Sequence, residues 1–415
     1  MIERVEVWID DELAGEGPAR VGELRAAGER GRMVTRFRYD SRWLVRGAGG
    51  FAIDPELPLG EGDFFPGAGC ALHGALRDTS PDRWGRRLMD RRERDEATRE
   101  RRRARALTEW DYMLGVQDAG RLGALRLRDP ESGCWLDERT PGIPPVARLR
   151  QLEAAAARID ADSTAPLDPA IASLIQPGSS LGGARPKATF RESDGSLWLA
   201  KFPSRDDRLD VGAAEYLLNQ LARACDIEVP PAWHKALGGR GRTFCVQRFD
   251  RRGSRRRMFW SAMTLLGKSD RDDAGYLDIA EALQNQADAN TVVPDLHQLY
   301  RRALFNILVG NRDDHLRNHG FLRQPSGWSL APAFDLNVEL DRLEHSLSID
   351  ESDHRPSPEN LRATAELYRL TPAAAARIED ELRARLANWR AMAKSIGIPG
   401  NEIDLLDSVI LRAGI

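Results

Sequence analysis

The segment FNILVGNRDDHLRNHGF, residues 305–321, decides how the rest of the chain is interpreted. Apolar residues recur at three- and four-residue steps from Leu296 to Leu308, which predicts a helix over residues 295–309 with one buried face. Gly310 comes next, and a helix often ends at a glycine because glycine adopts the left-handed conformation at little cost. We therefore expect a polar loop held by this helix, carrying Asp313, Asp314, His315 and Asn318.

A short hairpin is predicted directly after this loop. Residues 321–323 and 328–330 have the composition of strands, and Gln324-Pro325-Ser326-Gly327 has the composition of a turn. The second strand leads to Phe334 and Asp335. A hairpin of this kind brings a further carboxylate back toward the polar loop, which is one way to build a site for magnesium and phosphate.

The spacing of the polar residues favours one kind of chemistry. In kinases an aspartate accepts the proton of the attacking hydroxyl, while an asparagine five residues later and a more distant aspartate hold the metal. Asp313, Asn318 and Asp335 reproduce that order. The Asp-to-Asn interval alone is common, and a solvated loop that caps a helix would also contain it. The hairpin and the Phe334-Asp335 pair together favour the kinase interpretation.

Composition describes a globular protein with more than one domain. The chain has 415 residues, of which 41% are hydrophobic and 30% charged, and its net charge is −3. A chain with this charge has no overall field that attracts nucleic acid, so any such contact must be local. The four cysteines are scattered, with no Cys-x-x-Cys pair, and no apolar run is long enough to span a bilayer. We expect reduced thiols, a cytoplasmic location and no membrane contact.

The first 140 residues are predicted to form a β-rich module followed by a basic helix. Short strands are expected at 5–9, 37–39, 43–45 and 51–53. Residues 78–110 are predicted to be helical, and the stretch from Arg83 to Arg105 contains eleven arginines against five acids. This stretch is either a solvated helix of mixed charge or a contact with an acidic partner or a DNA backbone, and the sequence leaves its role open.

A Pro-rich linker at 141–145 separates this module from a predicted small lobe at 146–250. A Gly/Ser loop at 176–187 precedes a strand that ends near Lys201, and a helix over 212–225 carries Glu215 near its start. Loop, strand lysine and helix glutamate follow one another in this order in the small lobe of a kinase. Lys201 would then contact phosphate and Glu215 would orient it, although an acid near a helix start is also favoured by the helix dipole alone.

The remaining chain is expected to form a helical lobe over 251–415. The strand at 243–251 occupies the place of the hinge that meets adenine in a two-lobed kinase. After Asp335 we expect mostly helix, with Thr371 as the N-cap of a helix that has proline in its first turn. The predicted class is α+β, a two-lobed fold like that of protein kinases and phosphoinositide kinases.

Four motifs together resemble one known family. They are GSSLGGARPK at 178–187, RFDR at 248–251, NRDDHLRN at 311–318 and PAFD at 332–335. In combination they are similar to the HipA family, bacterial serine/threonine kinases that act as toxins of toxin–antitoxin pairs. The resemblance covers nearly the whole chain and includes TSPDRWG at 79–85. It implies ATP and Mg²⁺ as cofactors.

The resemblance also assigns roles by position. It implies that Asp313 is the catalytic base and that Asn318 and Asp335 hold the metal. The residues that it implies for nucleotide binding are Gly182, Gly183, Ala184, Arg185, Pro186, Lys187, Lys201, Gln247, Phe249, His315, Phe334 and Asp335. Ser180 matches a loop serine that members of the family autophosphorylate. No catalytic position departs from the pattern, so we expect an active enzyme.

The partners that the resemblance implies are a small helix-turn-helix antitoxin similar to HipB and a translation-related substrate such as an aminoacyl-tRNA synthetase. DNA contact is then expected only through the antitoxin complex. Two other classes are compatible with the residues. One is a small-molecule phosphotransferase, which shares the Asp-to-Asn arrangement. The other is a DNA-bound corepressor that uses the arginine-rich stretches.

Overall fold

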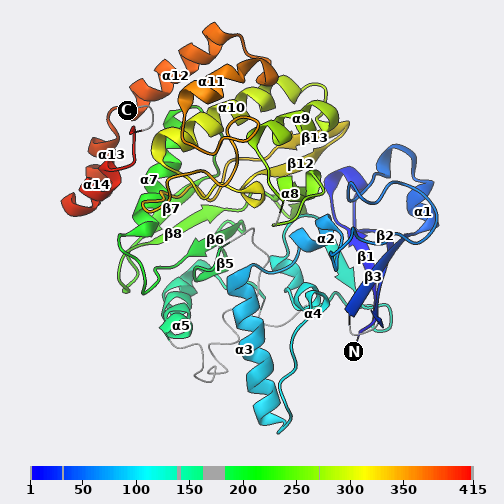
Figure 1. The fold of residues 1–415 in the computed structure, drawn as a ribbon. Helices are drawn as coiled ribbons and strands as arrows, with labels where there is room; N and C mark the ends of the chain where they lie inside the picture. The colour runs from blue at the N-terminus through cyan, green and yellow to red at the C-terminus, as the bar shows by residue number, and fades with distance from the viewer. Residues whose placement is uncertain (1, 30–31, 138–141, 162–182, 271, 413–415) are drawn as a thin grey trace. The chain divides into compact units, whose positions relative to one another are not determined.

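The structure is a computed structural model, which describes residues 2–29, 32–137, 142–161, 183–270 and 272–412 (Figure 1). The chain divides into two compact units. The first contains residues 1–200 and 250–267, and the second contains residues 201–249 and 268–415. Both units combine helices with strands, so the predicted α+β class is confirmed. None of the helices within the described ranges is long and apolar enough to cross a membrane.

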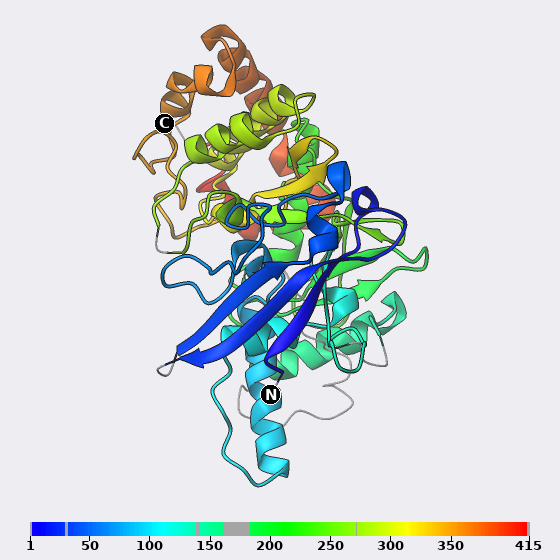
Figure 2. The ribbon, with the colours of Figure 1, turned by 90° about the vertical axis from the view of Figure 1, so that its right-hand side faces the viewer.

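An antiparallel sheet of four strands forms part of the first unit (Figure 2). Its order is β3-β2-β1-β4, with β1 at Arg4–Ile9, β2 at Ala19–Glu29, β3 at Arg32–Tyr39 and β4 at Leu125–Arg128. Alternate residues of β1 face the core, since Val5, Val7 and Ile9 are fully buried. The strands predicted at 5–9 and 37–39 are therefore confirmed.

Two other strands predicted in this module are wrong. Residues 43–45 lie at a short helix, α1 (Ser41–Leu44), because the side chain of Asp40 accepts a hydrogen bond from the Arg42 N–H at 2.9 Å and caps it. Residues 51–53 form no regular strand. The apolar run at Trp43 instead reflects one buried indole, whose Nε1 donates to the Phe51 carbonyl at 3.1 Å.

The predicted basic helix is shorter than expected. It begins with α2 (Gly74–Asp78) and α3 (Arg83–Arg99), after which the chain is irregular until α4 (Glu109–Leu114). Glu93 of α3 holds the irregular segment that follows the helix. Its carboxylate accepts hydrogen bonds from the Arg102 side chain and from the Arg105 N–H at 3.0 Å. Several arginines of the stretch are thus paired with acids of the same unit. The helix α5 (Leu149–Ala161) follows.

Buried hydrogen bonds join residues 250–267 to the rest of the first unit. The Gly123 N–H donates to Asp250 at 2.8 Å, and the Ser261 N–H donates to Asp78 at 2.7 Å. Burial raises the pKa of Asp78 to about 6. The short elements of this region are β9 (Arg251–Arg252), β10 (Arg255–Arg256), β11 (Phe259–Ser261) and α8 (Ala262–Leu265). Earlier in the sequence lie the strands β5 (Lys187–Arg191) and β6 (Leu197–Lys201).

The second unit is built around a long buried helix, α10 (Val292–Val309), which begins three residues before the predicted start. Its contacts include α9 (Tyr276–Gln286) and the hairpin of β12 (Gly320–Gln324) and β13 (Gly327–Leu330). The predicted hairpin is confirmed, with Phe321 opposite Leu330. The helix α7 (Val211–Ala224) packs on a second antiparallel hairpin, formed by β7 (Ala232–Lys235) and β8 (Thr243–Gln247).

The helical C-terminal part begins later than expected. Residues 336–357 contain no helix, and the helices start only at α11. These helices are α11 (Pro358–Ala363), α12 (Pro372–Leu386), α13 (Trp389–Ile396) and α14 (Gly400–Asp407). The predicted start of α12 is confirmed, because the Thr371 side chain accepts from the Ala374 N–H at 3.2 Å and Pro372 is its first residue.

Candidate functional site

The polar loop after α10 starts at a left-handed glycine, as predicted. Gly310 has φ +73°, and its N–H donates to the carbonyl of Asn306. A Cβ at this position would meet Val409 at 3.0 Å, so both conformation and space favour glycine. The chain then runs through residues 311–315 into a short 3₁₀ turn, η5 (Leu316–Asn318).

The two adjacent aspartates of the loop have opposite environments. Asp314 is 3% exposed and accepts hydrogen bonds from Tyr276 Oη, from Asn306 Nδ2 at 2.8 Å and from His319 Nε2 at 2.8 Å. Burial alone would raise the pKa of Asp314, but the charge and hydrogen bonds of its partners, His319 first, lower it below the ordinary value. The Asp313 side chain is 46% exposed. Asp313 is therefore the accessible carboxylate, and Asp314 fixes the loop.

Asn318 presents a buried acceptor. Its N–H donates to the His315 carbonyl at 2.8 Å, and its Nδ2 donates to the Asp313 carbonyl at 3.3 Å. Within the described part of the chain, the buried Oδ1 of Asn318 has no hydrogen-bond partner. A buried oxygen that lacks a donor is costly unless a further ligand satisfies it, and a divalent cation is such a ligand. His315 is half-buried and precedes η5 as its N-cap residue.

A buried lysine connects two carboxylates that are far apart in the sequence. Lys201 is the last residue of β6, and its Nζ donates to Glu215 and to Asp335. Glu215 lies near the start of α7 and is 4% exposed, and Asp335 follows the β12–β13 hairpin. Burial alone would lower the pKa of Lys201, but the charges of Asp335 and then Glu215 raise it above the ordinary value. The ammonium group is thus charged and pre-positioned.

Asp335 adopts an unusual backbone conformation. Its φ is +58°, in the left-handed region that non-glycine residues seldom occupy, and such residues cluster at functional sites. Asn337 Nδ2 donates to Asp335 Oδ1 at 3.1 Å. The preceding residue, Phe334, packs against Phe249 with 5.3 Å between ring centroids. Gln247, at the end of β8, is half-buried, and its N–H donates to the Pro231 carbonyl at 2.9 Å.

The residues predicted from the glycine-rich loop belong to the first unit where they are described. Ser180 and Gly182 lie outside the described residues. Gly183 has φ +93° and is exposed, as is Ala184, whereas Arg185 is half-buried and Pro186 is buried. Lys187 is 8% exposed, with Nζ 2.8 Å from Asp82 Oδ2, and its carbonyl accepts from Trp84 Nε1 at 3.0 Å. The structure thus gives Lys187 a carboxylate partner that the sequence did not identify.

The irregular segment after Asp335 contributes residues that sequence reasoning missed. The Glu339 N–H donates to the Gly310 carbonyl at 2.9 Å, and the Ser346 N–H donates to the Arg312 carbonyl at 2.9 Å. Burial, and then the charge of Asp313, raise the pKa of Glu339. This segment has neither periodicity nor a motif, so nothing in the sequence indicated that it packs against the polar loop.

Comparisons with known proteins identify the family that this chain resembles. A family model described as the HipA-like C-terminal domain matches residues 179–390. The serine/threonine-protein kinase toxin HipA of Shewanella oneidensis is 29% identical over 126 residues, which is 26% of this chain and 29% of that relative. This curated match therefore spans less than a third of the relative's length.

A solved structure resembles the whole chain. It is HipA of Shewanella oneidensis MR-1 in a complex with HipB and operator DNA, with a TM-score of 0.68. The match covers 97% of this chain and 94% of that chain at 18% sequence identity, so it supports the fold. The family model covers more than half of the 415 residues and includes Lys201, Asp313 and Asp335. The chain belongs to the HipA family.

Proposed function

We propose that this chain is an ATP-dependent serine/threonine protein kinase and the toxin of a toxin–antitoxin pair. The observation that carries the proposal is the buried Lys201, held by Glu215 and Asp335 in the same unit as the Asp313–Asn318 loop. A lysine with a helix glutamate, a base and two metal ligands are the parts that phosphoryl transfer requires. The kinase name of the Shewanella relative supports the same activity.

Each residue has a chemical role under this proposal. Asp313 accepts the proton of the attacking hydroxyl, which its exposed carboxylate can reach. Asn318 and Asp335 would hold magnesium, for which the buried Oδ1 of Asn318, unpaired among the described residues, is suited. When bound, the metal neutralises charge on the phosphates. Lys201 contacts phosphate and Glu215 keeps it in place.

The contact between Lys201 and Asp335 implies a rearrangement on nucleotide binding. The two side chains hydrogen-bond to each other in the structure. The proposed roles, however, require Lys201 to contact phosphate and Asp335 to hold the metal. Lys201 keeps a buried anionic partner in Glu215 when it turns to phosphate, so its charge stays compensated. We expect Asp335 to release the ammonium when nucleotide binds, so that its carboxylate would be available to hold a metal, while Asn337 continues to orient its Oδ1.

The proposal extends to the arrangement of the enzyme. We propose a two-lobed kinase-like fold, with residues 146–250 as the small lobe and 251–415 as the helical lobe. The glycine-rich loop at 182–187 would cradle the phosphates of ATP with its backbone N–H groups. The adenine would lie near Gln247, Phe249, Phe334 and His315. The packing of Phe249 against Phe334 supplies an apolar surface for such a ring.

The partners are proposed from the same family membership. The structural neighbour was solved with HipB and operator DNA, so we propose a HipB-like helix-turn-helix antitoxin that brings the chain to DNA. The proposed substrate is a translation-related protein such as an aminoacyl-tRNA synthetase, and Ser180 is the proposed autophosphorylation site.

The test is a transfer assay with radiolabelled ATP. The purified chain is incubated with cell proteins in one reaction and with small-molecule acceptors such as aminoglycosides and choline in another. Label on serine or threonine of a protein supports the proposal, and mass spectrometry of the labelled protein identifies the substrate. Label on a small molecule alone would show a phosphotransferase instead, and no transfer to either acceptor would overturn the proposal.

A further inference from the structure

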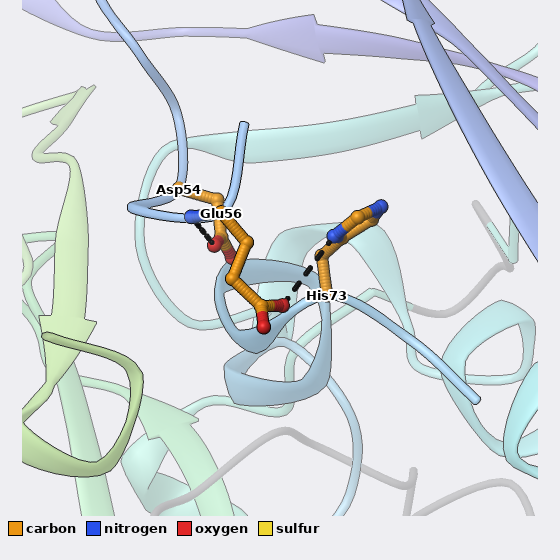
Figure 3. Close-up of side chains that lie close together, drawn as sticks. All are labelled: Asp54, Glu56 and His73. Carbon is orange, nitrogen blue, oxygen red and sulfur yellow. Dashed lines mark hydrogen bonds and ion pairs between the residues drawn. The ribbon is translucent and has the colours of Figure 1, made fainter. Parts of the chain in front are cut away.

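Three side chains outside the proposed kinase site converge in the first unit: Asp54, Glu56 and His73 (Figure 3). One ligand atom from each lies within 4.8 Å of the other two. His73 Nδ1 is 3.6 Å from Glu56 Oε2. Asp54 and His73 are buried, whereas Glu56 is exposed, so the cluster is open to solvent on the glutamate side.

The imidazole of His73 is the unusual member of this cluster. It is fully buried, and neither ring nitrogen has a hydrogen-bond partner among the described residues. A buried polar group without a partner costs free energy, and native structures seldom contain one without a reason. Nδ1, on the near edge of the ring, faces the Glu56 carboxylate (Figure 3). An imidazole nitrogen with a free lone pair that faces two carboxylates is a metal-ligating arrangement.

Asp54 is held in a fixed orientation. Its Oδ1 accepts from the Glu56 N–H at 2.8 Å, and its Oδ2 accepts from the Ala75 N–H at 2.5 Å. Each carboxylate oxygen still has a second lone pair, because one donor uses only one. Outer hydrogen bonds of this kind orient the carboxylates that ligate metals. Asp54 can therefore contribute a ligand without a rotamer change.

Hydrogen bonds from neighbouring side chains hold both ends of the segment that carries these residues. Tyr39 Oη donates to the Leu57 carbonyl at 2.6 Å, and Trp260 Nε1 donates to the Ile53 carbonyl at 2.8 Å. At the other end, Thr35 Oγ1 donates to the Ala71 carbonyl at 2.5 Å. Residues 51–73, all of which are described, contain no helix and only one isolated β-bridge, at Phe64. The cluster thus closes a long irregular loop at its base.

We propose that Asp54, Glu56 and His73 bind a zinc ion that clips this loop. Zinc is bound by imidazole and carboxylates at about 2.0–2.2 Å, so ligand atoms in a tetrahedral site are about 3.4 Å apart. The 3.6 Å between His73 and Glu56 is close to that value, and the exposed Glu56 side chain is free to adjust. Magnesium and calcium prefer sites made of oxygen only, which the imidazole disfavours.

Water completes the coordination from the exposed side of Glu56. A metal that joins residues 54 and 56 to residue 73 closes the irregular loop, and it stabilises the fold because the unfolded chain has no preformed site. This role is structural and does not rest on the proposed kinase activity. The magnesium ligands proposed above, Asn318 and Asp335, belong to the other unit.

The experiment uses the full chain, dialysed against a chelator and then titrated with Zn²⁺ in competition with a chromophoric chelator. Cys134 is exposed and could bind zinc adventitiously, so the background carries Cys134→Ser. The test variant is Glu56→Gln, because Glu56 is exposed and its replacement leaves the buried core intact. The matched control is Glu61→Gln, which changes another exposed acid of the same irregular segment.

We expect one zinc ion per chain and a higher Tm in its presence. Glu56→Gln should weaken zinc affinity by roughly tenfold or more and reduce the zinc-dependent rise in Tm, while the metal-free Tm stays unchanged. Glu61→Gln and Asp335→Asn should bind zinc as the parent does. Absence of stoichiometric binding, or equal affinity in Glu56→Gln and the parent, would overturn the proposal.

Discussion

Arg342 Nη1 lies 2.9 Å from Asp313 Oδ1, so an arginine of the segment after Asp335 covers the carboxylate that we propose as the catalytic base. Both side chains are about half exposed, at 50% for Arg342 and 46% for Asp313. Exposed pairs of this kind stabilise a fold by only about 0–1 kcal/mol. The contact can therefore break when a hydroxyl substrate reaches Asp313, at a small cost in free energy.

Replacing this arginine should ease access to the base. We expect Arg342→Gln to lower the KM for the protein acceptor up to about fivefold, because an interaction of at most about 1 kcal/mol no longer competes with the substrate. The matched control is Arg208→Gln, which removes an exposed pair with Asp341 in the same unit. Steady-state kinetics with varied acceptor measure the effect. An unchanged or higher KM would show that Arg342 does not compete at this site.

The two adjacent aspartates should respond differently to the same substitution. Asp313→Asn should reduce phosphoryl transfer by about 10²–10⁴-fold and leave the Tm unchanged, because an amide cannot accept the hydroxyl proton and the side chain is half exposed. Asp314→Asn should instead lower the free energy of unfolding by roughly 2–4 kcal/mol, since a buried, triply hydrogen-bonded carboxylate is lost. Thermal unfolding and transfer assays on both variants decide this. Normal turnover in purified Asp313→Asn would refute its assignment.

Lys201 and Asp335 should both be needed for use of MgATP. Lys201→Ala removes the charge opposite phosphate, and Asp335→Ala removes a metal carboxylate, so each should lower kcat/KM for MgATP by about a hundredfold or more. Lys201→Ala should also destabilise the fold by roughly 3–5 kcal/mol, because Glu215 stays buried without its cation. Nucleotide titrations and urea unfolding measure the two effects separately. If both variants keep normal turnover and affinity, the site is misplaced.

Phosphorylation of Ser180 should switch the enzyme off. A phosphate adds roughly −1.5 to −2 charges to the glycine-rich loop, where it repels the phosphates of ATP. We expect loss of nucleotide binding with an intact Asp313. Mass spectrometry after incubation with MgATP, followed by ATP affinity of the modified protein, tests this. An unmodified Ser180 in an active enzyme, or normal ATP affinity after modification, would contradict it.

His345 should make the fold less stable in mild acid. The side chain is 3% exposed, and burial lowers its pKa to about 4, whereas an unfolded histidine titrates near 6.5. Below pH 6.5 the unfolded state therefore binds a proton that the folded state does not, so stability falls as the pH drops from 6.5 toward 4. The loss amounts to roughly 3 kcal/mol.

Urea unfolding at pH 7.5 and at pH 4.5 tests this expectation. The variant His345→Asn should lose less stability between these pH values than the wild type, because its side chain does not titrate. The comparison cancels the contributions of the other titrating groups of the chain. The charges of Asp314, Arg312 and His354 also act on His345. If the two proteins lose the same free energy of unfolding, His345 does not cause the loss of stability in mild acid.

Elements that depend on local patterns were predictable from the sequence. The buried face of α10 follows from its periodicity, and its end follows from Gly310. The hairpin of β12 and β13 follows from a turn between two short apolar runs. The strand that ends in Lys201 and the helix that carries Glu215 were predicted for the same reason. In each case residues close in sequence determine the structure.

Features that depend on distant residues were not predictable. Asp313 and Asp314 are alike in sequence, and only the contact of Asp314 with Tyr276 and His319 separates their roles. The Lys201–Asp335 contact joins positions 134 residues apart. The strand predicted at 43–45 failed because one buried indole and an N-cap outweigh β propensity over so short a run.

The side chain of Asp82 joins a helix start to a lysine that lies far away in the sequence. It caps α3 by accepting from the Gly85 N–H at 2.8 Å, and it lies 2.8 Å from Lys187 Nζ. The family model starts only at residue 179. A truncated protein expressed from that point would lack the Asp82 carboxylate beside Lys187, and would also lack the Asp78 and Gly123 contacts of segment 250–267. We therefore expect that the region matched by the family model does not fold on its own.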